Sequence, residues 1–524
     1  MRGAIAAGHP LTAEAGAEIL REGGNAVDAC IAAAFASWVV ESPLTGPGAG
    51  GFLLVHLARD DSARLLDFFA AIPGHGLSRP PREMEEVDVE FDRETSQVFR
   101  IGAASCAVPG AAAGIEAAHR TFGTVEWARL FEPAIELARN GFELTRPQAY
   151  LHAILDLILR HTEPAREVYG PGGSRLAAGD RVVMPDLAAT LAQLARDGAG
   201  AFYGGELGKR VVRYLRSEGG SITERDLREY RVVSRRPVRV RFDGHEFVSN
   251  PPPSSGGVLI GYALLLLARL DVGGSPGSAG AIARLAEVMR EQTRVREGSF
   301  TSELYRGGLA RRLFAEPALG AAAERIAERE RGRSEPSAMT GTTHISVVDA
   351  AGNAASLTAS NGSGSGVVVP GTGIHLNNML GEYDLNPRSA QADGGRLAGR
   401  RLTSMMAPSV VLDGSRPRLV VGSAGSVRLR GAILQIVLNV AVHGMTVREA
   451  IDHPRIHLEE PHVHCEGGSD PAELDRLEAR GYDLVRWRRR NLYFGGAAAV
   501  ELREDGSLDA AGHPRRGGHG IVVG

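Results

Sequence analysis

A threonine at the start of a predicted strand is the residue best placed for nucleophilic chemistry. Thr342 opens the run ThrThrHisIleSerValValAsp (342–349), after a small and polar stretch that ends at Gly341. A threonine hydroxyl is a poor nucleophile near neutral pH and needs an adjacent base. If the bond before Thr342 were cut, its own α-amine, with a reference pKa of about 7.7 to 8.0, could serve as that base. No distant histidine or lysine would then be needed.

A second hydroxyl residue is predicted to lie beside Thr342. Two β-type runs, 342–348 and 354–360, flank AspAlaAlaGlyAsn, which has the composition of a turn. With the turn centred on Ala351, antiparallel pairing places Thr342 opposite Ser360. Asn361 and the loop GlySerGlySerGly follow directly.

A site for backbone donors is predicted in GlySerAlaGlySer (422–426). A hairpin formed by 409–412 and 418–422 runs into this turn, and a helical segment follows it. In a strand, tight turn and helix amino terminus, successive N–H groups converge on one point. Gly425 and Ser426 are therefore candidate donors to a developing negative charge.

Two other motifs favour structure over chemistry. GlyProGlyAlaGlyGly (46–51) matches GxGxxG, but it follows a helical segment and opens a strand, whereas a dinucleotide site needs the reverse order. His462 and His464 alternate on one strand face near His457 and Cys465, and could hold a metal. No third ligand has a helical or finger-like spacing, so we interpret this segment as an exposed edge strand and expect no metal or other cofactor.

Charge and lysine content exclude several classes of protein. The net charge of −3 provides no global basic field for nucleic acid or a membrane surface. The only lysine is Lys209, in GlyGlyGluLeuGlyLysArg (204–210), where Tyr203 and Arg210 replace the glycine and hydroxyl residue of a P-loop. Lys209 is interpreted as part of a solvated helix face, which makes a Schiff-base mechanism improbable.

Composition also bears on the compartment. The three cysteines are scattered with no CxxC pair, so neither a disulfide framework nor a zinc ribbon is indicated. The apolar stretches at 29–40 and 259–270 are too short to span a membrane. The amino terminus has no extended apolar region typical of an export signal, so we expect a cytoplasmic location, or a periplasmic or secreted one if a leader is missing.

The predicted elements divide the chain at about 341. Helical segments separated at Gly23 and Gly24 precede the strand after GlyProGlyAlaGlyGly, and 106–235 is largely helical. A hairpin is predicted around Asp243 and Gly244. Residues 321–341, which precede the expected cut, begin helical and end small and polar, and the second half is predicted to be an exposed, cleavable linker. Strands dominate after it.

Several blocks, in order along nearly the whole chain, resemble the gamma-glutamyltranspeptidase family of N-terminal-nucleophile hydrolases. They are ILREGGNAVDA (19–29), GPGAGGFLLV, AVPGAAAG, NPPPSSGG, TTHISVVDAAGNA, PGTGIHLNNM, RRLTSMMAPSVV and GSAGSVRLR. The resemblance implies an α+β fold, a four-layer αββα sandwich. It also implies one large domain made as an inactive precursor that cuts itself into 1–341 and 342–524.

The resemblance assigns catalytic roles to the motif residues. Thr342 would attack the Gly341 carbonyl, and water would resolve the resulting ester into two chains. The freed Thr342 would then attack a small-molecule amide, with its amine as general base. Ser360 matches a hydroxyl residue that touches the nucleophile. Gly425 and Ser426 match the oxyanion-hole pair, here Gly-Ser instead of Gly-Gly.

On the substrate side this sequence departs from the family. Phe69 stands where γ-glutamyl enzymes have an arginine for the substrate α-carboxylate, and phenylalanine cannot form that fork. Met379 replaces a glutamine, and Glu382 replaces an aspartate that receives the substrate amine. Thr403 and Ser404 resemble a carboxylate-binding Ser-Ser pair. Asn361 matches a family asparagine only if one residue is deleted before it.

The sequence therefore predicts a self-processing amidohydrolase or acyltransferase that cleaves a γ-glutamyl or related small acyl amide. The acyl group would pass to water or an amine, and the cut chains could assemble further. The alternative is an uncut, non-enzymatic descendant that binds or supports other molecules. A dinucleotide oxidoreductase is disfavoured by the order of elements around residues 46–51.

Overall fold

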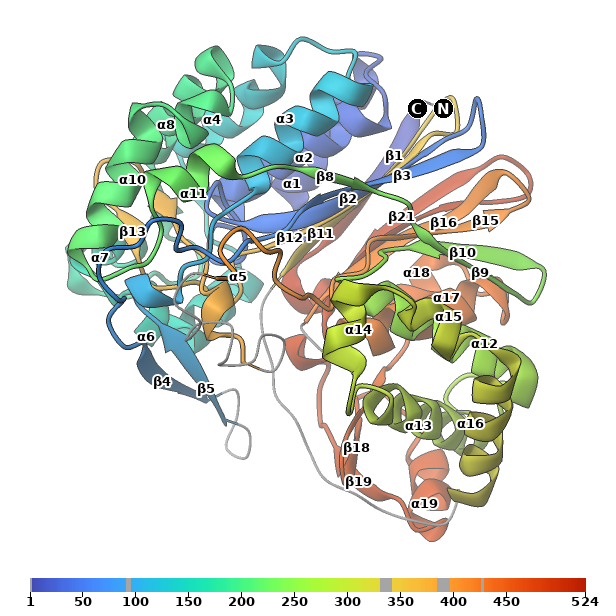
Figure 1. Ribbon diagram of the computed structural model, residues 1–524. Coiled ribbons are helices and arrows are strands. Elements are labelled where there is room, and N and C mark those ends of the chain that lie inside the picture. The colour runs from blue at the N-terminus through green and yellow to red at the C-terminus, as the bar shows by residue number, and fades with distance from the viewer. Residues whose placement is uncertain (1, 91–95, 330–341, 384–395, 426–427) are drawn as a thin grey trace.

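The computed structural model describes the chain except for residues 1, 91–95, 330–341, 384–395 and 426–427. Two antiparallel sheets face each other at its centre, and helices cover both outer faces (Figure 1). This arrangement confirms the predicted four-layer αββα sandwich.

The first sheet has seven strands and combines both ends of the chain with its middle. The order is β22-β1-β11-β12-β2-β3-β8. The strands are β22 (His519–Val523), β1 (Gly3–Ala7), β11 (Thr343–Asp349), β12 (Ala354–Ser360), β2 (Gly50–Leu57), β3 (Ser62–Phe68) and β8 (Val233–Arg235). Since β1, β2, β3 and β8 come from residues before 341, parts 1–341 and 342–524 share one sheet.

The second sheet has six strands in the order β21-β20-β16-β15-β10-β9. These are β21 (Leu508–Gly512), β20 (Gly496–Leu502), β16 (Arg416–Ala424), β15 (Ser409–Asp413), β10 (His245–Ser249) and β9 (Val238–Phe242). The hairpins predicted around Asp243 and Gly244 and at 409–422 are both confirmed. Apolar side chains such as Phe52, Phe69 and Val420 fill the space between the two sheets.

One helical layer covers the seven-stranded sheet. It comprises α1 (Pro10–Arg21), α2 (Ala26–Val40), α3 (Ala111–Phe122), α4 (Glu132–Asn140), α8 (Pro185–Asp197), α10 (Glu206–Ser217) and α11 (Glu224–Glu229). An Asn25 and Asp28 capping box starts α2. Every residue of α2 is buried, because this helix lies between the sheet and α4. Lys209 lies on the exposed face of α10, as predicted, and pairs with Glu206.

The second helical layer packs on the six-stranded sheet. Helices α12 (Gly256–Leu270), α17 (Leu429–Ala441) and α18 (Val447–Asp452) contact its strands, and α13 (Ala279–Arg294) and α16 (Glu316–Arg329) pack against α12 (Figure 1). The segment 321–341 begins helical, as predicted. Residues 321–329 continue α16, with Ala322 and Ile326 buried, because their apolar side chains reach the core. The rest of the predicted linker, 330–341, lies outside the described residues.

Shorter elements complete the fold. The helices are α5 (Arg146–Ile154), α6 (Asp156–Leu159), α7 (Glu163–Tyr169), α9 (Gly200–Tyr203), α14 (Phe300–Arg306), α15 (Leu309–Leu313) and α19 (Pro471–Ala479). The strands are β4 (Glu85–Glu90), β5 (Ser96–Ile101), β6 (Phe142–Glu143), β7 (Arg181–Val182), β13 (Val368–Val369), β14 (Ile374–His375), β17 (Ile456–Glu459), β18 (His462–Cys465) and β19 (Asp483–Arg486). No described helix is long and apolar enough to cross a membrane.

Candidate active site

Thr342 and Ser360 lie opposite each other where neighbouring inner strands of the seven-stranded sheet begin and end. Thr343 pairs with Ala359 in the β11–β12 ladder, so Thr342, one residue earlier, lies opposite Ser360. This is the register expected from the turn centred on Ala351. Ser360 in turn pairs with Gly50 at the start of β2. Because neighbouring strands are antiparallel, the start of β11, the end of β12 and the start of β2 lie side by side at the same end of the sheet.

Thr342 is nearly enclosed in the uncut chain. Its residue is 4% exposed, and it borders a cavity of about 30 Å³. A volume of this size accommodates little more than a water molecule. The carbonyl oxygen of Thr342 accepts a hydrogen bond from Arg516 Nη1 at 3.1 Å. The candidate nucleophile is therefore fixed by its backbone in a tight space.

A buried carboxyl group holds the next residue. Thr343 Oγ1 donates a hydrogen bond to Glu41, and Thr12 Oγ1 donates to Glu41 Oε1 at 2.8 Å. Burial raises the pKa of Glu41, while these hydroxyls and the charge of Arg516 oppose the rise. Burial and the nearby charge of Arg428 lower the pKa of Arg516 to about 10, and Glu41 opposes that change. Glu41 and Arg516 thus favour each other's charged forms, and each contacts one of the two threonines.

His344 has a structural place in the motif. Its Nε2 lies 2.9 Å from Ser346 Oγ, which itself donates to Ala498 O, so we assign the imidazole proton to Nε2. Nδ1 then accepts from Thr358 Oγ1 at 2.8 Å. Burial lowers the pKa of His344 to about 3, which keeps the ring neutral. His344 therefore packs between the two sheets, bonded to two residues of its own sheet, and is not a base for Thr342.

The predicted oxyanion turn lies next to the Thr342 cavity. Ala424, the last residue of β16, lines that cavity, and Gly425 follows with φ of 123°, a conformation that favours glycine. Gly422, at the other end of the turn sequence, also has to be glycine. A Cβ there would lie 2.2 Å from the His344 ring. Ser426 and Gly341 lie outside the described residues, so the donor pair and the cut bond remain predictions.

Asn361 and Glu382 lie beside the end of β12. The Ser360 hydroxyl accepts the Gly362 N–H at 2.7 Å, and a Cβ on Gly362 would be 2.6 Å from Glu382 Oε1. Asn361 is fully buried, yet neither atom of its side-chain amide has a hydrogen-bond partner among the described residues. An unpaired buried amide is costly, and such groups are typical of sites that bind a ligand or water.

Phe69 and Met379 belong to the apolar core between the sheets. They are 1% and 2% exposed, and the Phe69 ring stacks on Phe52 with centroids 5.4 Å apart. Neither residue lines the cavity at Thr342, and nor do Asn361, Glu382, Thr403 or Ser404. Ser404 Oγ accepts the Met406 N–H at 3.0 Å. The substrate-binding roles of these six residues remain predictions.

An arginine that the sequence analysis missed lies directly beside Phe69. Arg401 Nη1 donates to the Phe69 carbonyl at 2.7 Å, and Nη2 donates to Arg231 O at 2.7 Å. Its Nε lies 3.1 Å from Asp67 Oδ1. These contacts engage the guanidinium with the protein itself, so Arg401 does not offer a free fork to a substrate carboxylate.

Glu41 and Arg516 were also missed, although a weak signal existed for one of them. Glu41 is the first charged residue after the apolar run 29–40, and a carboxylate there needs a partner. Nothing in the sequence near Arg516 indicates that it reaches Thr342.

The histidine-rich segment differs from its interpretation as an edge strand. β18 is the middle strand of the sheet β17-β18-β19. His462 Nδ1 pairs with Asp483 at 3.1 Å, and His464 accepts from Trp487 Nε1 at 3.2 Å. Within the described ranges no group of three or more histidine, cysteine or acidic side chains is arranged to hold a metal ion.

Residues 12–523 match the sequence profile of the family described as gamma-glutamyltranspeptidase. The chain belongs to this family. An acylase ACY 1 proenzyme from Pseudomonas sp. strain SE83 is 33% identical to it, covering 100% of this chain and 94% of the relative. A glutathione hydrolase proenzyme from Escherichia coli K12 is 29% identical over 98% of this chain and 90% of that protein.

A solved structure has the same fold. The crystal structure of cephalosporin acylase from Bacillus halodurans superposes with a TM-score of 0.86, at 24% identity, over 99% of this chain and 95% of that one. At that identity the match shows the fold. Family membership makes the chain a self-processing amidohydrolase or acyltransferase that is cut into two chains and takes small-molecule amides. Nothing in the comparisons favours the non-enzymatic alternative.

Proposed function

We propose that Thr342 is both the cutting residue and the catalytic nucleophile. Its hydroxyl attacks the Gly341 carbonyl, the Gly341–Thr342 C–N bond breaks, and the ester formed is hydrolysed by water. The products are a new carboxyl group on Gly341 and a free Thr342 amine. The freed hydroxyl then attacks a substrate amide, its proton passes through the α-amine to the leaving amine, and water releases the acid.

We further propose that the donor is an acyl amide without the amino-acid head of a γ-glutamyl group. The observation that carries this proposal is the substitution at Phe69. The family's arginine is replaced by a buried aromatic ring, and the neighbouring Arg401 is bonded to backbone carbonyls and near Asp67. An arginine–carboxylate fork is a strong contact, and Arg401, the arginine beside Phe69, does not replace it.

Two further observations support an acylase. The amide of Asn361 is buried and unpaired at the edge that carries Thr342 and Ser360, which suits a polar group of the substrate. Relatives named acylase ACY 1 proenzyme, at 33% identity, are more similar than the glutathione hydrolase proenzyme of Escherichia coli, at 29%. The glutathione hydrolase relatives make γ-glutamyl transfer the second candidate.

The two candidates are separated by three 4-nitroanilides. The γ-glutamyl anilide carries an amine and a carboxylate, the glutaryl anilide carries only the carboxylate, and the butanoyl anilide carries neither. We expect kcat/KM for one of the two simpler anilides to exceed that for the γ-glutamyl anilide at least tenfold. A γ-glutamyl anilide that is tenfold better than both would reject the acylase and support the second candidate. Thr342→Ala provides the background rate.

A further inference from the structure

A buried glutamine in the wall of the Thr342 cavity joins three separate segments of the chain. Gln148 is 8% exposed and lies in the first turn of α5. Its side chain bonds to Val40 at the end of α2 and to His9 in the loop between β1 and α1, which lie 108 and 139 positions earlier in the chain. No step of the reaction proposed above uses this side chain.

The carbonyl oxygen of the Gln148 amide accepts from three donors. It accepts the Thr145 N–H at 3.0 Å and the Thr145 hydroxyl at 2.9 Å, as part of the capping box that starts α5. It also lies 3.2 Å from His9 Nε2. Since His9 Nδ1 accepts the Leu11 N–H at 3.1 Å, the ring proton lies on Nε2 and is donated to Gln148. Burial lowers the pKa of His9 to about 4, so the ring stays neutral with that one proton.

The nitrogen of the same amide donates to the carbonyl oxygen of Val40. Val40 ends α2, and the last carbonyl groups of a helix have no partner within the helix. Glu41 follows directly, and its carboxylate accepts the Thr343 hydroxyl. A glutamate at position 148 could complete the same capping box, but an ionised carboxylate has no proton to donate to Val40. The bond to Val40 therefore requires an amide, and it fixes the backbone immediately before Glu41.

The bond to His9 bears on the same carboxylate. Gly8 precedes His9, and a Cβ on Gly8 would lie 2.3 Å from Glu41 Oε2 and 3.0 Å from Thr343 Oγ1. The backbone at Gly8 thus borders the hydrogen bond between Glu41 and Thr343 directly. Gln148 consequently bonds to the residue before Glu41 and to the residue after Gly8.

The start of α5 also packs against the segment that carries Arg516. The short helix η8 (Pro514–Arg516) contacts α5, and a Cβ on Gly517 would lie 3.4 Å from Pro147. Arg516 donates in turn to the carbonyl oxygen of Thr342. The start of α5 thus contacts this second segment as well as the end of α2.

We propose that Gln148 is a positioning residue for self-cleavage. It fixes the end of α2 against the loop that contains Gly8. Glu41 then keeps Thr343, and with it the backbone of Thr342, in the geometry for attack on the preceding bond. Gln148 acts through Glu41 and not on the reacting atoms. The inference rests on the proposal that Thr342 cuts the chain.

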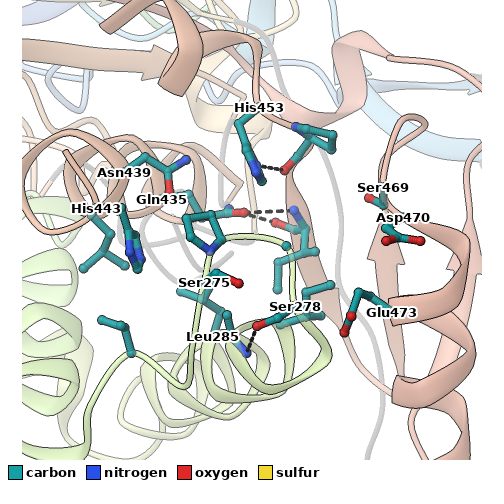
Figure 2. A pocket seen from close by; sticks show the side chains of 18 of the residues that line it. Ser275, Ser278, Leu285, Gln435, Asn439, His443, His453, Ser469, Asp470 and Glu473 are labelled. Carbon is teal, nitrogen blue, oxygen red and sulfur yellow. Dashed lines mark hydrogen bonds between the residues drawn. The ribbon is translucent and has the colours of Figure 1, made fainter. Parts of the chain in front are cut away.

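A second buried glutamine provides a matched control. Gln435 is 7% exposed and lines a different cavity, of about 350 Å³, in the outer helical layer (Figure 2). Its nitrogen donates to Gly431 O at 2.8 Å and to Ile456 O at 3.0 Å, and its oxygen accepts the Ile456 N–H at 3.0 Å. Gln435 therefore joins a helix to a distant segment, as Gln148 does, but it does not line the cavity at Thr342.

Self-cleavage rates of Gln148→Met and Gln435→Met, followed after dilution of the uncut chain from denaturant, test the proposal. Both variants lose a buried amide, so both should lower the melting temperature, measured in the Thr342→Ala background. In the folded fraction we expect Gln148→Met to be cut at least tenfold more slowly than wild type, and Gln435→Met within twofold of it. Gln148→Glu, which keeps the capping box, should be at least threefold slower at about pH 8. Equal cleavage rates in Gln148→Met and Gln435→Met, or a wild-type rate in Gln148→Glu, would overturn the proposal.

A double-mutant cycle separates positioning from packing. If Gln148 acts through Glu41, Gln148→Met should slow cleavage less than threefold in a Glu41→Gln background, against at least tenfold in wild type. Equal fold-losses in the two backgrounds would mean that the residues act independently, and would overturn the proposal. An uncut wild-type chain would reject the role of Thr342 and this inference with it, whereas a normally cut Gln148→Met chain rejects only the inference.

Discussion

The nucleophile side and the substrate side of the candidate site are built differently. Around Thr342 the contacts are polar, with Arg516 on its carbonyl and Glu41 on Thr343. Around Phe69 and Met379 they are apolar, and both side chains lie in the core between the sheets. The difference indicates that the cutting machinery depends on hydrogen bonds that tolerate little change. On the substrate side, Phe69 fills the core at the position where the sequence comparison with the family predicts a charged contact.

Among the variants that test this difference, Glu41→Ala should have the largest effect on self-cleavage and stability. Removing the carboxylate leaves the buried Thr343 and Thr12 hydroxyls without their acceptor, which costs about 1–3 kcal/mol. It also removes the negative charge that opposes the fall in the pKa of Arg516. We expect slow or absent self-cleavage and a lower denaturant midpoint. Glu41→Gln keeps an acceptor, so its cleavage rate and denaturant midpoint should lie between those of wild type and Glu41→Ala. Glu14→Gln, at an exposed pair with Arg21, is the control. Normal cleavage in Glu41→Ala would show that this carboxylate is not needed for self-cleavage.

Acid should destabilise the fold before it protonates most carboxylates. Burial lowers the pKa of His344 to about 3 and those of His9, His152 and His375 to about 4. The unfolded chain, with histidine pKa values near 6.5, binds more protons below that pH. Stability is therefore full above about pH 6.5 and is lost as pH falls toward 4. Urea midpoints at pH 7.0, 6.0 and 5.0 should fall in that order, and equal midpoints would contradict the assignment of neutral, buried rings.

Arg516→Lys should have a smaller effect than loss of Glu41. Lysine keeps a charge near Glu41 but lacks the fork that reaches the Thr342 carbonyl. We expect self-cleavage about tenfold slower, measured by the time course of the uncut chain after dilution from denaturant, with little change in melting temperature. Arg516→Gln should be slower still. A cleavage rate equal to wild type in both variants would mean that this hydrogen bond does not position the nucleophile.

Phe69→Leu tests the other side of the comparison. We expect about 1 kcal/mol of destabilisation from lost packing on Phe52, with unchanged self-cleavage. The ratios of kcat/KM among the three anilides should change a few-fold. Met379→Leu should behave similarly with a smaller stability change. If either variant blocked cleavage while remaining folded, the two sides would not be separable.

Lys209→Gln should have the smallest effect. The side chain is exposed and pairs only with Glu206 on the same helix face. Self-cleavage, turnover and melting temperature should all match wild type. A loss of activity would show that the only lysine has a role which the account does not give it.

Local patterns in the sequence predicted much of the nucleophile side. The β11–β12 hairpin is short, so counting from its turn placed Ser360 opposite Thr342. The local residue pattern likewise predicted the turn at Gly425 and the order of elements around Gly50. These features depend on residues close together in the chain.

Contacts between distant segments could not be predicted in the same way. Glu41 and Arg516 approach Thr342 and Thr343 from opposite ends of the chain, and no spacing rule links them. The role of His344 depends on the packing of one sheet on the other, and Arg401 is identified as a neighbour of Phe69 only once β3 and the segment before Leu402 are placed together. The helical start of 321–341 was predicted, but the burial of Ala322 and Ile326 depends on how α16 packs against α12 and α13.

Intact mass spectrometry of the purified wild-type chain and of Thr342→Ala shows whether Thr342 cuts the bond before it. We expect two wild-type fragments with the masses of 1–341 and 342–524, and a single uncut Thr342→Ala chain of 524 residues. A wild-type chain that stays uncut, a cut at another bond, or cleavage that persists in Thr342→Ala would contradict this expectation.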